Sequence, residues 1–413
     1  MRIAIAIAII ILGAIVFLSY TPTADQPASS HTPRNRKSIM APKATDVIHP
    51  DANPFVQRAI HEFEKYIQTE IDNRQAPGAA VAIVHDTSII FVKGYGLREI
   101  GKPDSVNAET IFRVGSVSKS ITATLAAELV NEHIIQWDDP VIKYLPHFKL
   151  KSEEATQKLK LRHILSHTEG LPYHAFTDLV DQNAPVDTLI SYLGNLNLIA
   201  EPGEVYSYQN VGFTLIGKVM EAATHQPFEQ IITEKLFRPL GMQHASASFA
   251  QISQAKNTAK PHSYTHPVKI SKTYYSVAPA GGINASALDL ALWLKALLAP
   301  NIVMPAARIH EMLEPQVRAV ARNLYFWQWK PVRKSYYGLG WRIVTFRDDT
   351  VAYHGGYVNH YRSEVAFNQK KKIAIAVLVN APGRLADQAI PRFFKIYDQY
   401  LDSIRQWKVK PLP

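Results

Sequence analysis

The spacing of hydrophobic and polar residues changes several times along the 413-residue chain, and each change predicts a different element. Between residues 53 and 71, apolar side chains from Val56 to Ile71 recur at the three- or four-residue spacing of an amphipathic helix. Residues 77–96 hold two runs of β-forming residues on either side of His85-Asp86-Thr87, which indicates a β-hairpin. The first part of the chain that could fold therefore reads as a helix followed by two strands.

The middle and the end of the chain show a different balance. Helical and turn-rich patterns fill most of residues 117–300, and a helix is expected to begin where Ser286 and Asp289 stand at capping-box spacing. Strand patterns return at residues 336–344, 363–367 and 372–380, and residues 386–404 predict a final helix that Pro391 can kink. No internal repeat interrupts this order.

Strands near both ends of the chain bracket a mostly helical middle, and this order predicts the α+β class. We expect an antiparallel sheet built from both chain ends and flanked by helices, together with an inserted, mainly helical lobe. A cleft between two such lobes is a natural place for a site.

The first 54 residues do not fit a packed core. Residues 3–20 are uncharged and follow Arg2, and their number is close to the roughly 20 residues that span a bilayer. We expect residues 1–20 to be an uncleaved membrane anchor of an exported protein facing the periplasm or exterior, or a cleaved signal peptide of a secreted one. Residues 21–54, rich in proline, serine, threonine and charge, predict a flexible tether, which leaves residues 55–405 for the folded domain.

Composition then excludes several kinds of chemistry. The chain has no cysteine, so it can form neither disulfides nor a thiolate nucleophile. Its net charge of +10 comes from scattered lysines and arginines without a basic arm, which argues against a nucleic-acid partner. Neither a phosphate loop nor a dinucleotide fingerprint is present, and the histidine spacing at 163 and 167 lacks the glutamate of a metalloprotease motif. We therefore expect neither cofactor nor metal.

A candidate nucleophile lies in the stretch RVGSVSKSITAT, residues 113–124. Ser116 and Lys119 stand one helical turn apart, so on a helix they share a face. A lysine with a lowered pKa can take the proton of a serine, and at a helix start the serine amide is free to donate to an oxyanion. The same Ser-x-x-Lys spacing recurs at Ser253 and Lys256, and a capping serine with a solvated lysine is the alternative interpretation.

Two further stretches supply groups that such a serine needs. Tyr208 and Asn210 lead into an apolar helix; a tyrosine beside a lysine can shuttle protons, and the asparagine can bind a substrate carbonyl and the lysine. The alternative is a core tyrosine and a capping asparagine.

Further on, residues 354–356 (His-Gly-Gly) suggest an edge strand that a ligand can approach. There the Tyr357 amide is a second oxyanion donor, and His354 can bind a carboxylate or assist proton transfer; a glycine turn with a surface histidine is the alternative.

Taken in order, Ser116-x-x-Lys119, Tyr208-x-Asn210 and His354-Gly355-Gly356 resemble the three motifs of the serine β-lactamase and penicillin-binding superfamily. Flanking stretches such as LRHILSHTEGLP, LFRPLGM and YGLGW resemble its class C β-lactamase, D-alanyl-D-alanine carboxypeptidase and esterase branch over roughly residues 56–400.

This resemblance implies that Ser116 is acylated, that Lys119 and Tyr208 act as general base and acid, and that the Ser116 and Tyr357 amides form the oxyanion hole. Asn210, His354, Gly355, Gly356 and Tyr357 are then the substrate-binding residues.

The third motif of the family usually begins with lysine, whereas here it begins with His354. This difference removes a fixed charge for a substrate carboxylate, which disfavours efficient β-lactamase activity and permits esters or amides without that group. We expect a serine hydrolase acting on a D-amino-acid peptide, a β-lactam or a small ester. The alternative is a membrane-tethered sensor or scaffold protein without catalysis.

Overall fold

The computed structural model describes residues 46–48, 51, 53–301, 303–319, 326, 328–329, 332–346 and 349–407. The expected membrane anchor (residues 1–20) and most of the expected tether (residues 21–54) lie outside these residues. Within the part of the chain that is described, no helix combines the length and the apolar character needed to cross a bilayer. The anchor, the domain boundaries and the tether up to residue 45 therefore stay predictions, whereas Val47 and Ile48, expected within the flexible tether, pair with the sheet.

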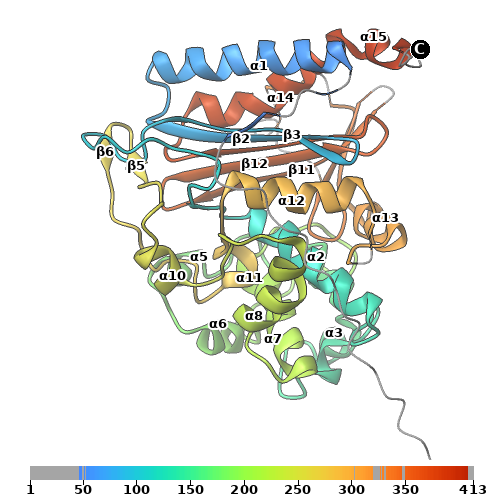
Figure 1. The fold of residues 1–413 in the computed structure, drawn as a ribbon. Helices are drawn as coiled ribbons and strands as arrows, with labels where there is room; N and C mark the ends of the chain where they lie inside the picture. Colours follow the sequence, from blue (N-terminus) through green and yellow to red (C-terminus); the bar gives the residue numbers. More distant parts are fainter. Residues whose placement is uncertain are drawn as a thin grey trace, which may run out of the picture. The chain divides into compact units, whose positions relative to one another are not determined.

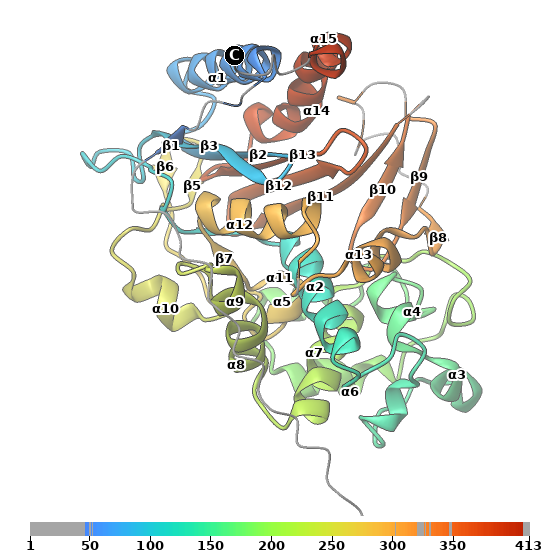
Figure 2. The ribbon, with the colours of Figure 1, turned by 45° about the vertical axis from the view of Figure 1, so that its right-hand side comes forward.

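A nine-stranded antiparallel sheet lies between two layers of helices (Figures 1 and 2). Its strand order is β1-β3-β2-β13-β12-β11-β10-β9-β8, so strands from both ends of the chain meet in its middle, as predicted. The strands are β1 (Val47–Ile48), β2 (Gly78–His85), β3 (Ser88–Gly96), β8 (Val317–Arg318), β9 (Lys334–Tyr337), β10 (Arg342–Thr345), β11 (Thr350–Val358), β12 (Tyr361–Asn368) and β13 (Ile373–Val379).

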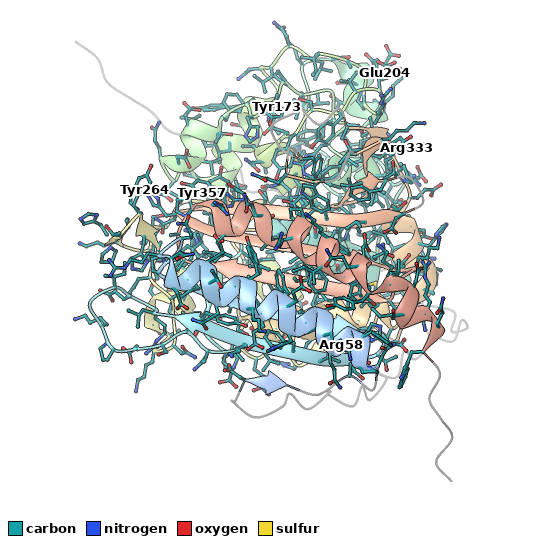
Figure 3. The ribbon with its side chains drawn as sticks, turned by 90° about the horizontal axis from the view of Figure 1, so that it is seen from above. Arg58, Tyr173, Glu204, Tyr264, Arg333 and Tyr357 are labelled. Atoms are coloured by element: carbon teal, nitrogen blue, oxygen red, sulfur yellow. The ribbon has the colours of Figure 1, made fainter. Side chains whose placement is uncertain are left out.

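Alternation along the strands gives the sheet two buried faces. On β2, Ala80 and Ala82 belong to one hydrophobic core, while Val81 and Ile83 belong to the other, because successive side chains of a strand point to opposite faces. Helices α1 (Pro54–Asp72), α14 (Arg384–Gln399) and α15 (Leu401–Gln406) cover the second face, which Figure 3 views from the side of α1 and α14. Helix α12 (Ala287–Leu298) and the helical lobe cover the first face.

The helical lobe is inserted between β3 and β8 and packs its core against the first face of the sheet. Its elements are β4 (Phe112–Arg113), α2 (Val117–Asn131), η1 (Val141–Lys143), α3 (Glu153–Lys158), α4 (Leu161–Leu165), α5 (Thr177–Asp181), α6 (Val186–Leu193), α7 (Asn210–Thr224), α8 (Phe228–Ile232), η2 (Thr233–Phe237), α9 (Arg238–Leu240), α10 (Phe249–Gln254), β5 (His262–Ser263), β6 (His266–Pro267), α11 (Ala278–Gly281), β7 (Asn284–Ala285) and, after α12, α13 (Ala306–Leu313). This arrangement confirms the predicted α+β class.

Several predicted elements appear with sharper boundaries. The Ser286 hydroxyl accepts a hydrogen bond from the Asp289 amide, and the Asp289 carboxylate accepts from the Ser286 amide, so the predicted capping box begins α12. Helix α14 continues through Pro391 and ends at Gln399, so the chain does not break at the proline.

Two strand predictions were wrong in detail. Residues 336–344 form no single strand: they close a hairpin between β9 and β10, where Gly340 adopts φ +75° and turns the chain. The strand that contains His354, β11, is internal and lies between β12 and β10. Its pairing with β10 ends at Tyr353, however, so residues 354–358 extend past β10 and pair with β12 alone. A free backbone edge thus exists on an internal strand, and it lies beside α2.

Candidate active site

Ser116 is held where the N-terminus of α2 meets the free edge of β11. The preceding residue, Gly115, adopts φ +50°, and a Cβ added to it would lie 2.8 Å from the backbone nitrogen of Tyr357. A Cβ added to Gly356 would lie 2.1 Å from the carbonyl oxygen of Val114 and 3.1 Å from the Ser116 nitrogen. The two glycines therefore permit an approach between helix and strand that no side chain allows, and this approach brings the Ser116 and Tyr357 amides together.

Lys119 lies one turn further along α2 and is fully buried, whereas Ser116 is partly exposed. Its Nζ donates to Asn210 Oδ1 over 2.7 Å and to the carbonyl oxygen of Ala280 over 2.8 Å. The same nitrogen is 3.3 Å from Ser116 Oγ. The amine is thus fixed by two acceptors on one side and faces the candidate nucleophile on the other.

The surroundings of Lys119 disfavour its charged form. Burial lowers the pKa of Lys119 well below its usual range, and the nearby Arg342 guanidinium lowers it further, while Glu169 acts in the opposite direction. The Nζ atom also lies 4.7 Å from the centre of the Tyr208 ring. A buried lysine with a lowered pKa is able to accept a proton near neutral pH.

Tyr208 and Asn210 come from the N-terminus of α7. The side chain of Gln209 caps this helix by accepting a hydrogen bond from the Val211 amide, and this cap fixes the direction of the two residues beside it. The Tyr208 hydroxyl lies 2.8 Å from Ser116 Oγ and donates to it. The ring of His174 stacks on the Tyr208 ring with centres 5.2 Å apart. The first two motifs of the sequence are therefore brought into direct contact.

His354 lies on the same sheet face as the nucleophile, but it is fully buried. Its Nδ1 lies 2.9 Å from the carbonyl oxygen of Gly355, which can only accept, so Nδ1 carries the proton. Burial lowers the pKa of His354 well below its usual value, and the Arg342 and Lys119 cations lower it further. The neutral ring then accepts at Nε2 from the hydroxyl of Tyr337, 2.9 Å away. This placement differs from the expectation of a surface histidine or a substrate-facing imidazole.

Sequence reasoning missed Arg342, which follows the Gly-Leu-Gly-Trp turn of the β9–β10 hairpin. Arg342 stands directly opposite Tyr337 in that hairpin. Its guanidinium carbon lies 5.4 Å from the centre of the Tyr208 ring and 5.6 Å from that of the Tyr337 ring, and its Nη1 donates to the Tyr206 hydroxyl over 3.1 Å. A fixed cation thus stands beside the catalytic tyrosine candidate. Recognising the hairpin turn would have placed it there.

A second group that the motifs did not single out lies behind Tyr208. His167 is fully buried, its ring centre lies 4.3 Å from that of Tyr208, and its Nδ1 accepts from the Gln209 amide over 3.3 Å. Burial lowers the pKa of His167 well below its usual value. Among the described residues, no group of three or more histidine, aspartate or glutamate side chains is arranged to hold a metal ion. The contacts of His167 are those of a side chain that packs on the Tyr208 ring and accepts from the neighbouring backbone.

Comparisons with known proteins agree with this geometry. The profile of the Beta-lactamase family matches residues 63–395. The protein flp of Staphylococcus aureus (strain N315) is 24% identical over 328 residues, which cover 77% of this chain and 62% of that protein. The unguisins hydrolase ungD' of Aspergillus campestris is 27% identical over 336 residues, or 77% of this chain and 61% of that protein. The chain thus spans somewhat less than two thirds of these relatives. Among solved structures, the octameric penicillin-binding protein homologue from Pyrococcus abyssi is 25% identical with a TM-score of 0.72, covering 83% of this chain and 77% of that one.

Proposed function

Because this chain belongs to the beta-lactamase family of serine hydrolases, we propose that it cleaves an amide or an ester through an acyl-enzyme on Ser116. The observation that carries the proposal is the pair of contacts at the serine hydroxyl. Ser116 Oγ lies 2.8 Å from the Tyr208 oxygen and 3.3 Å from Lys119 Nζ, both within reach of a proton transfer. Lys119 and Tyr208 are buried, whereas Ser116 is partly open to solvent and can meet a substrate.

The contacts of Lys119 support a neutral amine as the base. A neutral amine has two N–H groups, and the Asn210 and Ala280 oxygens accept them. The remaining lone pair then faces Ser116 Oγ, which is the arrangement required of a base. An ammonium would instead bring a third proton toward the same oxygen. Burial and the Arg342 charge both favour the neutral form.

In the proposed reaction, Ser116 Oγ attacks the substrate carbonyl carbon as its proton passes to Lys119, directly or by way of Tyr208. The carbonyl oxygen gains negative charge, and the Ser116 and Tyr357 amides donate to it. When the intermediate collapses, the bond to the leaving amine or alcohol breaks, and Tyr208 gives that group a proton, which Lys119 replaces. A water molecule then attacks the acyl-enzyme with the same groups as base and acid, which releases the acid product and restores Ser116.

The strand side of the site informs the choice of substrate. A neutral, buried His354 supplies no charge to a substrate carboxylate, and this supports small esters and amides over penicillins. The unguisins hydrolase among the relatives is a hydrolase by name, which supports turnover over binding alone. We further propose that residues 1–20 anchor the protein, so that the domain acts on the outer side of the membrane on small-molecule or peptide substrates.

Labelling with a fluorophosphonate tests the proposal, followed by peptide mapping of the labelled residue and a substrate panel of nitrophenyl esters, D-alanyl-D-alanine peptides and a chromogenic cephalosporin. We expect one label on Ser116 and turnover that is greatest for the esters. Ser253→Ala is the matched control, because Ser253 begins the second Ser-x-x-Lys of the chain and lies in α10. A folded protein that no acylating probe labels, yet that binds a penicillin equally well with Ser116→Ala, would be a non-catalytic sensor or scaffold.

A further inference from the structure

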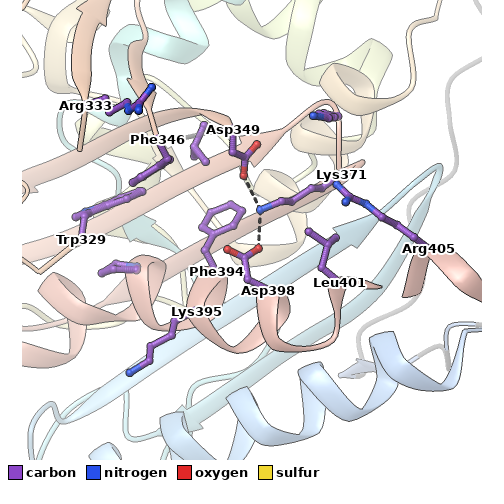
Figure 4. A pocket seen from close by; sticks show the side chains of 13 residues that line it. Trp329, Arg333, Phe346, Asp349, Lys371, Phe394, Lys395, Asp398, Leu401 and Arg405 are labelled. Atoms are coloured by element: carbon purple, nitrogen blue, oxygen red, sulfur yellow. Dashed lines mark hydrogen bonds and ion pairs between the residues drawn. The ribbon is translucent and has the colours of Figure 1, made fainter. Parts of the chain in front are cut away.

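A cavity of about 580 Å³ lies on the α14 side of the sheet, and none of the proposed catalytic residues lines it (Figure 4). Its walls come from α14, α15, the end of β10, the start of β11 and the turn between β12 and β13. The lining residues are Trp329, Arg333, Phe346, Asp349, Val351, Lys370, Lys371, Pro391, Phe394, Lys395, Asp398, Leu401 and Arg405. The volume falls in the range that holds a drug-sized molecule, roughly 300–1,000 Å³.

One part of the wall is apolar and aromatic. The rings of Trp329 and Phe346 stack with centres 5.9 Å apart and planes inclined by 12°, and Phe394 lies between them and Lys371 in Figure 4. Val351 and Leu401 add aliphatic surface. Such a wall favours the apolar part of a ligand, since covering it removes hydrocarbon surface from water.

The charged part of the wall carries more cations than anions. Its basic residues are Arg333, Lys370, Lys371, Lys395 and Arg405, and its acidic residues are Asp349 and Asp398. The side chain of Lys371 is only 5% exposed, and its Nζ lies 2.5 Å from a carboxylate oxygen of each aspartate. Both carboxylates of the cavity are therefore engaged by one lysine.

The cations at the rim of the cavity differ from Lys371 in exposure and in ion pairing. The side chains of Arg333, Lys395 and Arg405 form no ion pair with a carboxylate among the residues that the structure describes, and all three are exposed. Three rim cations around an apolar wall create a site where an anionic head and a hydrocarbon body are satisfied together. A neutral apolar ligand would use the wall alone, and a cationic one would be repelled.

We propose that this cavity binds an amphipathic anion, namely a molecule with an apolar chain or ring and a carboxylate or phosphate head. The apolar part lies against Trp329, Phe346 and Phe394, and the head meets whichever of Arg333, Lys395 and Arg405 it reaches, since these three cations lie on different sides of the cavity (Figure 4). Two sources carry this chemistry: a free single-chain amphiphile and the head of an anionic membrane lipid. Either would give the protein a second site on the face of the sheet opposite the nucleophile, and the inference does not depend on the proposed reaction.

The test measures decanoate binding to the full chain by titration calorimetry, with decanol as the neutral probe and decyltrimethylammonium as the cationic one. The rim variant is the triple substitution Arg333→Gln, Lys395→Gln and Arg405→Gln. The matched control Lys65→Gln, Lys102→Gln and Lys256→Gln removes the same charge from exposed positions that do not line the cavity. We expect decanoate to bind, the rim variant to weaken it about tenfold or more, and the control to change it less than about twofold.

A vesicle arm separates the two sources. Phosphatidylglycerol vesicles that bind the wild-type chain and the control more strongly than they bind the rim variant would identify a lipid head, while decanoate binding without this difference would identify a free amphiphile. Circular dichroism checks that each variant is folded. Failure of the wild-type chain to bind decanoate, or equal weakening in the rim and control variants, would overturn the proposal. Ser116→Ala is expected to bind decanoate like the wild type, so failure of the proposed reaction leaves this result intact.

Discussion

The two sides of the candidate site are built differently. On the helical side, Lys119 and Asn210 are buried and joined by hydrogen bonds, so their geometry is set before any substrate arrives. On the strand side, the backbone amide of Tyr357 comes close to the nucleophile, the Tyr357 side chain is 56% exposed, and His354 is buried with its Nε2 bonded to the Tyr337 hydroxyl. In the proposed reaction, the helical side would carry the chemical step and the strand side would recognise the substrate, and it is on the strand side that the chain departs from the usual motif.

The largest effect on activity is expected when the Ser116 hydroxyl of the helical side is removed. Ser116→Ala is expected to lower kcat by about 10⁴-fold or more toward any substrate that the protein turns over, because no other group can form the acyl-enzyme. Steady-state kinetics with a nitrophenyl ester measure the effect. Ser253→Ala should leave kcat unchanged, and comparable losses in both variants would contradict the assignment.

Tyr208→Phe tests the second group of the helical side. The ring and its packing against His174 are retained, but the hydroxyl 2.8 Å from Ser116 Oγ is lost, so kcat should fall about 10²- to 10³-fold with little change in KM. A loss of less than about threefold would show that Lys119 alone transfers the proton.

On the strand side, the positive charge of Arg342 lowers the pKa of Lys119, and Arg342→Gln measures the size of this effect. Removing this cation raises the pKa of Lys119, because one of the two causes that lower it is gone. Activity requires the neutral amine and therefore rises with pH through that pKa, so the rising limb of the pH–rate profile should move to higher pH. On that rising limb, kcat/KM at a fixed pH should fall about tenfold, and Arg342→Lys should restore most of it. An unshifted limb would exclude Arg342 from this role.

His354→Lys tests whether the fold tolerates the lysine that usually begins the third motif. The new ammonium would be buried next to the Arg342 charge, so we expect a loss of about 2–4 kcal/mol in unfolding free energy and no gain of β-lactamase activity. Combining it with Arg342→Gln should recover part of that loss in a denaturation cycle. Additive losses would mean that the two positions are independent.

The smallest effect is expected at Tyr357. Its contribution to the oxyanion hole is a backbone amide, which Tyr357→Ala retains, so kcat should stay within about threefold while KM rises severalfold for aromatic esters. A large fall in kcat instead would indicate that the Tyr357 phenol takes part in the reaction, so the strand side would also contribute a side chain to the chemical step.

The sequence predicts the helical side better than the strand side for a physical reason. Ser116 and Lys119 are related by one helical turn, and Tyr208 and Asn210 stand where a helix begins, so local periodicity places them. The fold class follows in the same way from the order of strands and helices along the chain.

The strand side depends on pairing between distant segments, which spacing does not reveal. Both halves of residues 336–344 favour strands, and the turn at Gly340 that sets Arg342 opposite Tyr337 gives only a weak signal. Motif order places His354 on the correct strand, but its depth is set by Tyr337, which covers it from the neighbouring hairpin. The predicted edge strand was wrong, and His354, which was expected to face a substrate or, in the alternative interpretation, to lie on the surface, is fully buried.

The most direct test of the account is the pH dependence of single-turnover acylation, followed by the mass of the intact protein reacting with an excess of slow ester. If Lys119 is a neutral base beside Ser116, the rate of acyl-enzyme formation should rise with pH to a plateau reached well below pH 10.5, and Lys119→Met should remove that rise. Acylation with the same pH dependence in Lys119→Met, or mass added at a residue other than Ser116, would contradict the account.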